Sequence, residues 1–146
     1  MKSKRLDRKR GPQKSRATRR TRHNALIEAL VKTYPEIRTT GFANAIRKAV
    51  GPEDAAESAE LIASVRPDAY AVHSEEMEIV AFEVEDRHHL SETKIFEYGR
   101  LYFLLQEEGW GLGLIRVSAW GECTACDLLT ASIRIAINTG EETFSF

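Results

Sequence analysis

The stretch RPDAYAVHSEEMEIVAFEVED, residues 66–86, decides the fold because it holds two alternating apolar runs joined by a polar turn. This alternation predicts two β-strands that pair as a hairpin. The predicted faces of the second strand are Ile79, Ala81, Glu83 and Glu85 on one side and Val80, Phe82 and Val84 on the other. Two carboxylates therefore point the same way, into a face that is otherwise apolar.

The rest of the chain predicts an α/β domain. Helical spacing of apolar residues predicts helices over 24–35, 41–52 and 91–109. The segment 52–65 opens with acids typical of a first helical turn and then takes on strand character near Ile62 to Val65. Further strands are predicted over 111–121 and, from the alternation of Ile133, Ile135 and Ile137, within 126–140.

The composition indicates one compact domain of a soluble, intracellular protein. The chain has 146 residues, 42% of them hydrophobic, which is enough for a real core. It has no apolar run of the roughly 18 to 20 residues that cross a bilayer, so no membrane partner is expected and the cytoplasm is the predicted location. Its two cysteines, Cys123 and Cys126, are half of a zinc site at best, and we expect reduced thiols on a strand or its turn.

The net charge of −1 hides a division between a basic N-terminus and an acidic body. Residues 1–22 hold eleven Lys or Arg and one acid, a net charge of +10, whereas the remaining 124 residues hold 10 basic and 21 acidic side chains, a net charge of −11. With Leu6 as its only large apolar residue besides Met1, this arm is predicted to be disordered when free and to bind phosphate backbones without reading sequence. Its predicted nucleic-acid contacts are Lys9, Arg10, Lys14, Arg16, Arg19, Arg20 and Arg22.

The acids of the hairpin predict a metal site. Asp68 begins the first strand, and pairing of the two strands would bring it towards Glu83 and Glu85. Three convergent carboxylates repel one another unless a cation neutralises them, and hard oxygen ligands suit Mg²⁺ or Mn²⁺. Such an ion polarises a phosphodiester and lowers the pKa of a bound water, so the expected chemistry is hydrolysis of a nucleic-acid backbone.

Taken in order, RPDAY, FEVED, SETKIFEYGRLY and GLGLIRV resemble the core of the PD-(D/E)xK nuclease superfamily over roughly residues 60–118. The resemblance implies a restriction-endonuclease-like fold, a mixed central sheet flanked by helices. It also implies that Asp68 and Glu83 are the metal ligands. Glu85 stands at the third motif position, which is usually Lys, although some restriction endonucleases of the superfamily carry Glu there.

The helix after the acidic strand offers a replacement for the missing lysine. Lys94 and Tyr98 are four residues apart and so share a helix face, similar to the Gln-x-x-x-Tyr element of recombination-type nucleases in the superfamily. The resemblance implies that Lys94 orients the attacking water or stabilises developing charge, and that Tyr98 hydrogen-bonds a phosphate. An upstream helical acid, either Glu28 or Glu57, would complete the metal shell.

These observations predict a metal-dependent deoxyribonuclease of a prokaryotic or phage-infected cell. A homodimer is compatible with this prediction by analogy with small nucleases that cut both strands of a duplex. Two other classes fit the same sequence. One is a nuclease-fold protein without activity that binds nucleic acid or a protein. The other is an interaction protein whose anionic body mimics DNA or docks a basic partner.

Overall fold

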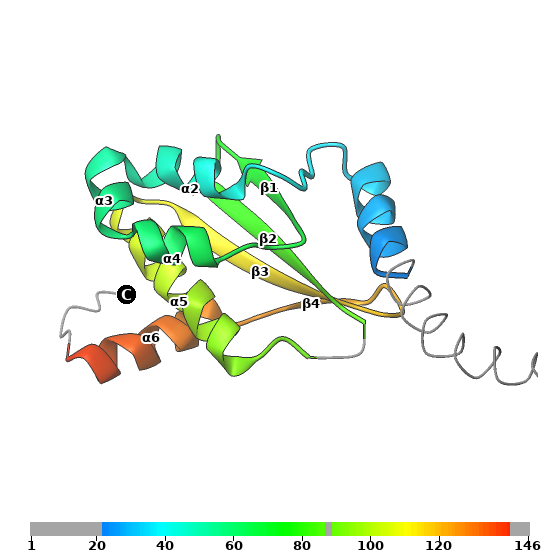
Figure 1. The fold of residues 1–146 in the computed structure, drawn as a ribbon. Coiled ribbons are helices and arrows are strands. Elements are labelled where there is room, and N and C mark those ends of the chain that lie inside the picture. Colours follow the sequence, from blue (N-terminus) through cyan, green and yellow to red (C-terminus); the bar gives the residue numbers. More distant parts are fainter. Residues whose placement is uncertain (1–21, 87–88, 141–146) are drawn as a thin grey trace, which may run out of the picture.

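The computed structural model describes residues 22–86 and 89–140, and it has an α/β fold with a central sheet and helices (Figure 1). A first helix covers residues 22–33 and begins upstream of Asn24, the residue that the sequence suggested as its cap. The other helices are α2 (Phe42–Val50), α3 (Pro52–Glu57), α4 (Ala59–Ser64), α5 (Glu92–Glu107) and α6 (Leu128–Thr139). The strands are β1 (Ala69–His73), β2 (Glu78–Glu85), β3 (Gly111–Ser118) and β4 (Cys123–Ala125).

The sheet is mixed and open, with the strand order β1-β2-β3-β4. Strands β1 and β2 form the predicted antiparallel hairpin, in which Ala69 pairs with Phe82. Strand β3 returns through α5 to lie parallel to β2, and Glu83 pairs with Arg116 across them. Strand β4 then pairs antiparallel with β3. This order places the acidic end of β2 between the start of the hairpin and the end of β3.

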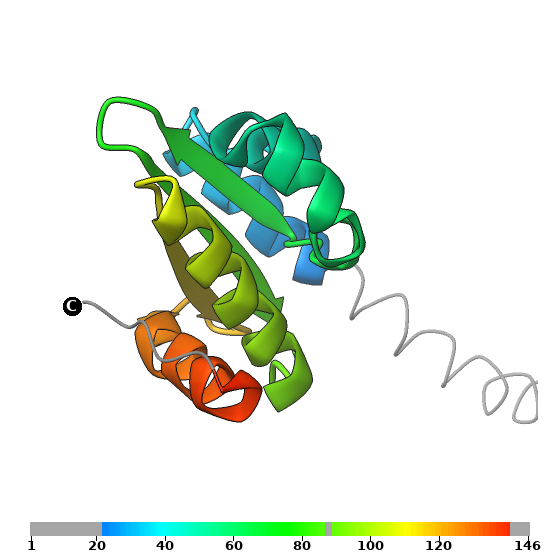
Figure 2. The ribbon, with the colours of Figure 1, turned by 90° about the vertical axis from the view of Figure 1, so that its left-hand side faces the viewer.

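The two faces of the sheet form two cores of different size. The face that carries Ile79 and Ala81 packs against α2, α4, α5 and α6 and forms the larger core. The opposite face, which carries Phe82 and Val117, is covered by Leu30 of the first helix and by Ile37. In Figure 2, α5 and α6 lie in front of the sheet and the blue helix 22–33 lies behind it. The alternation in β2 therefore assigned the faces correctly.

Helix α5 positions the candidate site and is the element that the local sequence specifies best. The Ser91 side chain accepts a hydrogen bond from the Lys94 N–H, as an N-cap does, and Gly109 follows the helix with a φ of +80°. The helix packs against α6, and the two helices come close together at Gly99. A Cβ at that position would lie 2.8 Å from the Cβ of Ala131.

Two predicted strands are wrong. Ile62 is buried in helix α4, so Ile62 to Val65 do not form a strand. The segment 126–140 forms helix α6 instead of a strand, because the Asp127 side chain caps it by accepting from the Thr130 N–H and because its small buried side chains pack on α5. The alternating isoleucines of this segment do not share one buried face, since Ile137 is 72% exposed.

Other predictions concern the ends of the chain and its cysteines. Cys123 and Cys126 are free thiols on β4 and directly after it, as predicted. No helix of the part that the structure describes is long and apolar enough to cross a membrane. Of the predicted nucleic-acid contacts, Lys9, Arg10, Lys14, Arg16, Arg19 and Arg20 lie outside the described residues.

Candidate functional site

Asp68 and Glu83 lie side by side at the open end of the β1–β2 hairpin. The Asp68 N–H donates to the Phe82 carbonyl at 3.1 Å, and the Val84 N–H donates to Asp68 Oδ2 at 2.7 Å. The first bond joins the Asp68 backbone to the residue before Glu83, and the second joins its side chain to the residue after Glu83, so Asp68 lies beside Glu83 just beyond the last ladder pair, Ala69–Phe82. The chain therefore brings the first two predicted metal ligands close together, and the charge of Asp68 acts on Glu83.

Glu83 is the least exposed charged residue among the described residues, with 7% of its surface exposed. The Tyr98 hydroxyl donates to its Oε1 at 2.6 Å. Burial raises the pKa of Glu83, and the nearby charge of Asp68 raises it further, whereas the Tyr98 hydroxyl, Lys94 and His23 act in the opposite direction. The Tyr98 hydroxyl thus holds the Glu83 carboxylate in place, and burying its ionised form lowers the stability of the folded protein.

Tyr98 is 1% exposed, and its hydroxyl bonds Glu83, so it acts on that carboxylate. Burial and the charge of Glu83 raise the pKa of Tyr98, which keeps the hydroxyl protonated as a donor. The structure therefore gives Tyr98 a positioning role in place of the predicted contact with a phosphate.

We expect Tyr98→Phe to lower the free energy of unfolding by about 1–3 kcal/mol at pH 8, because it leaves a buried carboxylate without its donor. Urea unfolding at pH 8 and at pH 4 measures this loss, which should shrink at pH 4 as Glu83 takes up a proton. Tyr102→Phe is the matched control, since Tyr102 is half-buried on the same helix. Equal losses in the two variants would contradict the assigned contact.

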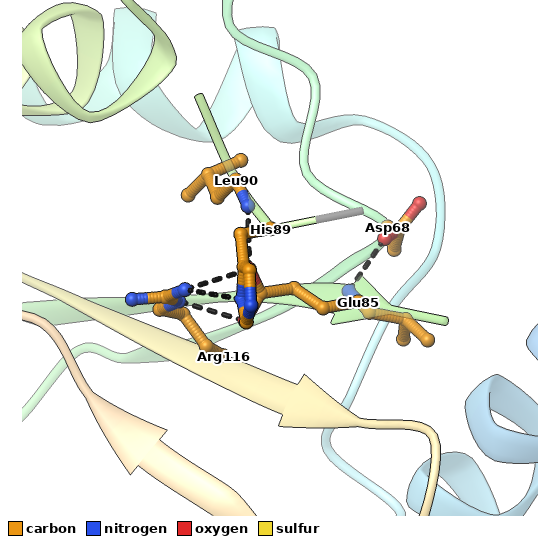
Figure 3. Close-up of polar contacts among 6 residues, drawn as sticks. Asp68, Glu85, His89, Leu90 and Arg116 are labelled. Atoms are coloured by element: carbon orange, nitrogen blue, oxygen red, sulfur yellow. Dashed lines mark hydrogen bonds and ion pairs between the residues drawn. The ribbon is translucent and has the colours of Figure 1, made fainter. Parts of the chain in front are cut away.

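Glu85 does not join the other two acids, so the prediction of three convergent carboxylates is wrong. Arg116 binds Glu85 with two hydrogen bonds, from Nε to Oε1 at 2.7 Å and from Nη2 to Oε2 at 2.8 Å. The Leu90 N–H also donates to Oε2, and His89 Nδ1 lies 3.5 Å from the same oxygen. Figure 3 shows these groups gathered around Glu85, with Asp68 apart from them. A strand face can thus carry two acids with different partners.

Arg116 holds the pKa of Glu85 below its usual range. Because the folded pKa is lowered, the pair stabilises the protein at pH values above the unfolded value near 4.5, and this contribution is lost as the pH falls through the folded pKa. We therefore expect Arg116→Gln to be less stable than the parent at pH 7 and to approach it in stability as the pH falls well below 4.5. Thermal unfolding over pH 2.5–7 tests this, and a loss that does not depend on pH would contradict it.

The start of the first helix contacts two acids at this end of the sheet. His23 Nε2 lies 3.3 Å from Asp68 Oδ1, and Arg22 Nη2 lies 3.6 Å from Asp86 Oδ1. The two oxygens of Asp86 are buried and make no hydrogen bond within the described residues. Arg22, predicted as a nucleic-acid contact, is therefore in an ion pair with the body, although its side chain remains 45% exposed.

The remaining predicted residues divide between the site and other surfaces. Lys94 is exposed in the first turn of α5, and its charge acts on Glu83. Glu57 lines a cavity with Asp54 and Glu107 on the α3 side of α5, so it lies with a different group of acids. The other upstream acid, Glu28, is exposed on helix 22–33.

Asp68 and Glu83 are the two carboxylates that would hold a divalent ion at this site. Within the described residues, no three His, Cys, Asp or Glu side chains are grouped so that they could hold a metal. Mg²⁺ does not require such a cage, because it commonly binds one or two carboxylates and keeps waters and substrate phosphates as its other ligands. Asp68 and Glu83 would hold the ion, and neutralising their mutual repulsion would remove part of the cost of burying Glu83.

Sequence reasoning did not identify two important contacts. The first is the Glu85–Arg116 pair, for which a signal existed: Arg116 continues the stripe of Leu112 and Leu114, and an arginine in an apolar stripe needs a carboxylate partner. The second is the contact of His23 with Asp68, 45 residues away, for which no local pattern exists.

Comparisons of the chain with protein-family models, with curated proteins and with solved structures found no match in any of the three.

Proposed function

We propose that the chain is a metal-dependent nuclease that hydrolyses phosphodiester bonds of DNA at Asp68 and Glu83. The observation that carries the proposal is the burial of Glu83 beside a second carboxylate. Two neighbouring acids, one of which has a raised pKa and is buried at a cost in protein stability, are typical of a functional site. Mg²⁺ or Mn²⁺ bound there would supply Lewis-acid activation of the phosphodiester and of water.

The surrounding residues have consistent roles in this proposal. Tyr98 orients the Glu83 carboxylate, and the backbone N–H of Val84 orients that of Asp68. Lys94 is exposed and close enough to act on Glu83, so it can stabilise charge on a phosphate or hold the attacking water. The order of hairpin, helix and parallel strand over residues 69–118 agrees with the restriction-endonuclease-like core that the motif resemblance implies.

The direct test incubates the purified full-length chain with supercoiled, linear, single-stranded and branched DNA in Mg²⁺, in Mn²⁺ and in EDTA. We expect cleavage of at least one substrate with a divalent ion and none in EDTA. A second readout is thermal unfolding at pH 7, which Mn²⁺ should shift upwards because the ion binds the folded state. Absence of both effects would overturn the proposal.

A nucleic-acid-binding protein of the same fold without activity is the second candidate. The observation that favours it is the Glu85–Arg116 pair, since the side chain at the usual lysine position is an acid held by two hydrogen bonds. This candidate predicts DNA binding that is equal in Mn²⁺ and EDTA, with no cleavage in either.

A further inference from the structure

Two neighbouring cavities meet at the start of α2. One has a volume of about 380 Å³ and the other about 520 Å³. Both are lined by Thr40, Gly41 and Asn44, so they adjoin each other around the first turn of the helix, and together we call them one depression. The hydroxyl and amide groups there are donors of the kind that bind phosphate oxygens.

Four cations line this depression, and no carboxylate does. Arg47 and Arg66 line the smaller cavity, and Arg38 and Lys48 line the larger one. By contrast, the cavity between α3, α5 and α6 is lined by three acids and one arginine, namely Asp54, Glu57, Glu107 and Arg100. The acidic body therefore has a distinct positive region, which we call the α2 cation surface and define by Arg38, Arg47, Lys48 and Arg66.

The charges of the α2 cation surface are available to a ligand. All four side chains are exposed, and none forms an ion pair with a carboxylate in the described part of the chain. Arg47 donates to the Asn44 side chain, and Arg66 to the Ala63 carbonyl, so both keep further donors and their full charge. Four exposed cations without acids between them would repel one another, and an anionic partner would relieve that repulsion.

The surface rests on a fixed part of the fold. The backbone of Arg38 exchanges two hydrogen bonds with Tyr70 of β1, at 2.8 and 2.9 Å, and the Tyr70 hydroxyl donates to the Thr40 carbonyl at 2.6 Å. These contacts hold the segment before α2 against the sheet. At the other end, Arg66 is two residues before Asp68, so the surface runs towards the candidate site.

We propose that the α2 cation surface binds the sugar-phosphate backbone of DNA and leads the strand to Asp68. The part of this inference that leads the DNA strand to Asp68 rests on the proposed function, whereas binding of DNA to the α2 cation surface does not require cleavage. Phosphate contacts of this kind release counterions and carry no sequence information, so binding here is expected to be general and sensitive to salt.

The test measures binding of full-length protein to a fluorescein-labelled DNA duplex by anisotropy in EDTA, over 50–200 mM NaCl. The variants are the doubles Arg38→Gln/Lys48→Gln and Arg47→Gln/Arg66→Gln. Lys32→Gln/Arg134→Gln is the matched control, because it removes two exposed cations from the first helix and from α6. All three doubles change the net charge by the same amount and keep residues 1–21.

Each α2 double should lower the magnitude of the slope of log K against log[NaCl] by about 1.8, which is about 0.9 for each lost phosphate contact, while the control leaves the slope unchanged. Equal slopes in all three doubles would overturn the proposal. Because EDTA prevents metal-dependent cleavage, failure of this test is separate from failure of the nuclease assay. Binding that shows the expected slopes without any cleavage would support the surface and contradict the proposed enzyme.

Discussion

Glu83→Gln is expected to lower metal-dependent DNA cleavage by on the order of 100- to 1000-fold. The substitution keeps the size of the side chain and its ability to accept the Tyr98 hydrogen bond, but removes the negative charge that holds the ion. Loss of the several kcal/mol that a metal ion contributes to transition-state stabilisation accounts for this magnitude. Cleavage rates at saturating DNA measure it.

The lower cleavage expected for Glu83→Gln does not come from unfolding of the variant. The pKa of Glu83 is raised in the folded state. The protein is therefore most stable, as far as Glu83 is concerned, below the ordinary pKa of 4.5, and it loses stability as the pH rises through the folded pKa. A neutral glutamine avoids that loss, so the variant should be at least as stable as the parent at pH 8 in urea unfolding. Its affinity for DNA in EDTA should also be unchanged.

The matched control is Glu78→Gln, which removes the same charge from an exposed position at the start of the same strand. It should cleave like the parent. Asp68→Asn should resemble Glu83→Gln, and the double variant should be little worse than either single one, since both residues serve one ion. Cleavage by Glu83→Gln at the parental rate would place any activity elsewhere.

Gly99→Val is expected to lower the free energy of unfolding by about 1–3 kcal/mol, the usual cost of overpacking. A Cβ at this position would lie 2.8 Å from the Ala131 Cβ and 3.1 Å from two backbone atoms of α6, so a larger side chain must force the two helices apart. The small gain in helix propensity from removing a glycine is on the order of 0.5 kcal/mol, too little to offset this. Urea unfolding at pH 7 measures the difference.

Gly113→Val is the control for that variant. A Cβ at Gly113 would have its nearest neighbours at 3.7 Å or more, and valine suits a strand. The substitution should therefore change stability little. If Gly99→Val were as stable as Gly113→Val, the close packing of α5 on α6 would be wrong.

The parts of the fold that were predictable are those with local signals. The β1–β2 hairpin follows from alternation around a polar turn, and α5 follows from its Ser91 cap and Gly109 stop. Helix α6 was missed because the alternation of its isoleucines suggested a strand despite the Asp127 cap, and because its packing on Gly99 joins segments about 30 residues apart. Tertiary contact overrode local pattern there.

The candidate site divides in the same way. The predicted hairpin brought Asp68 towards Glu83 and Glu85 alike, and in the structure Asp68 lies beside Glu83 through its bonds to Phe82 and Val84. The partner of Glu85 depended on which strand lies beside β2, and a sequence alone does not state that β3 lies there in parallel register. Glu85, the third acid of the predicted metal site, is thus bound by Arg116 of the neighbouring strand.

The contacts of Arg22 and His23 with Asp86 and Asp68 tether the basic N-terminal segment at the candidate site. Residues 1–21 are covalently joined at this point, so whatever shape they take, anything they hold stays within about 75 Å of Asp68. A phosphate chain bound by these residues would have an effective concentration on the order of 1 mM inside such a sphere. Its encounter with the two carboxylates would then be nearly unimolecular, and a body with an excess of negative charge would not need a high affinity of its own for DNA.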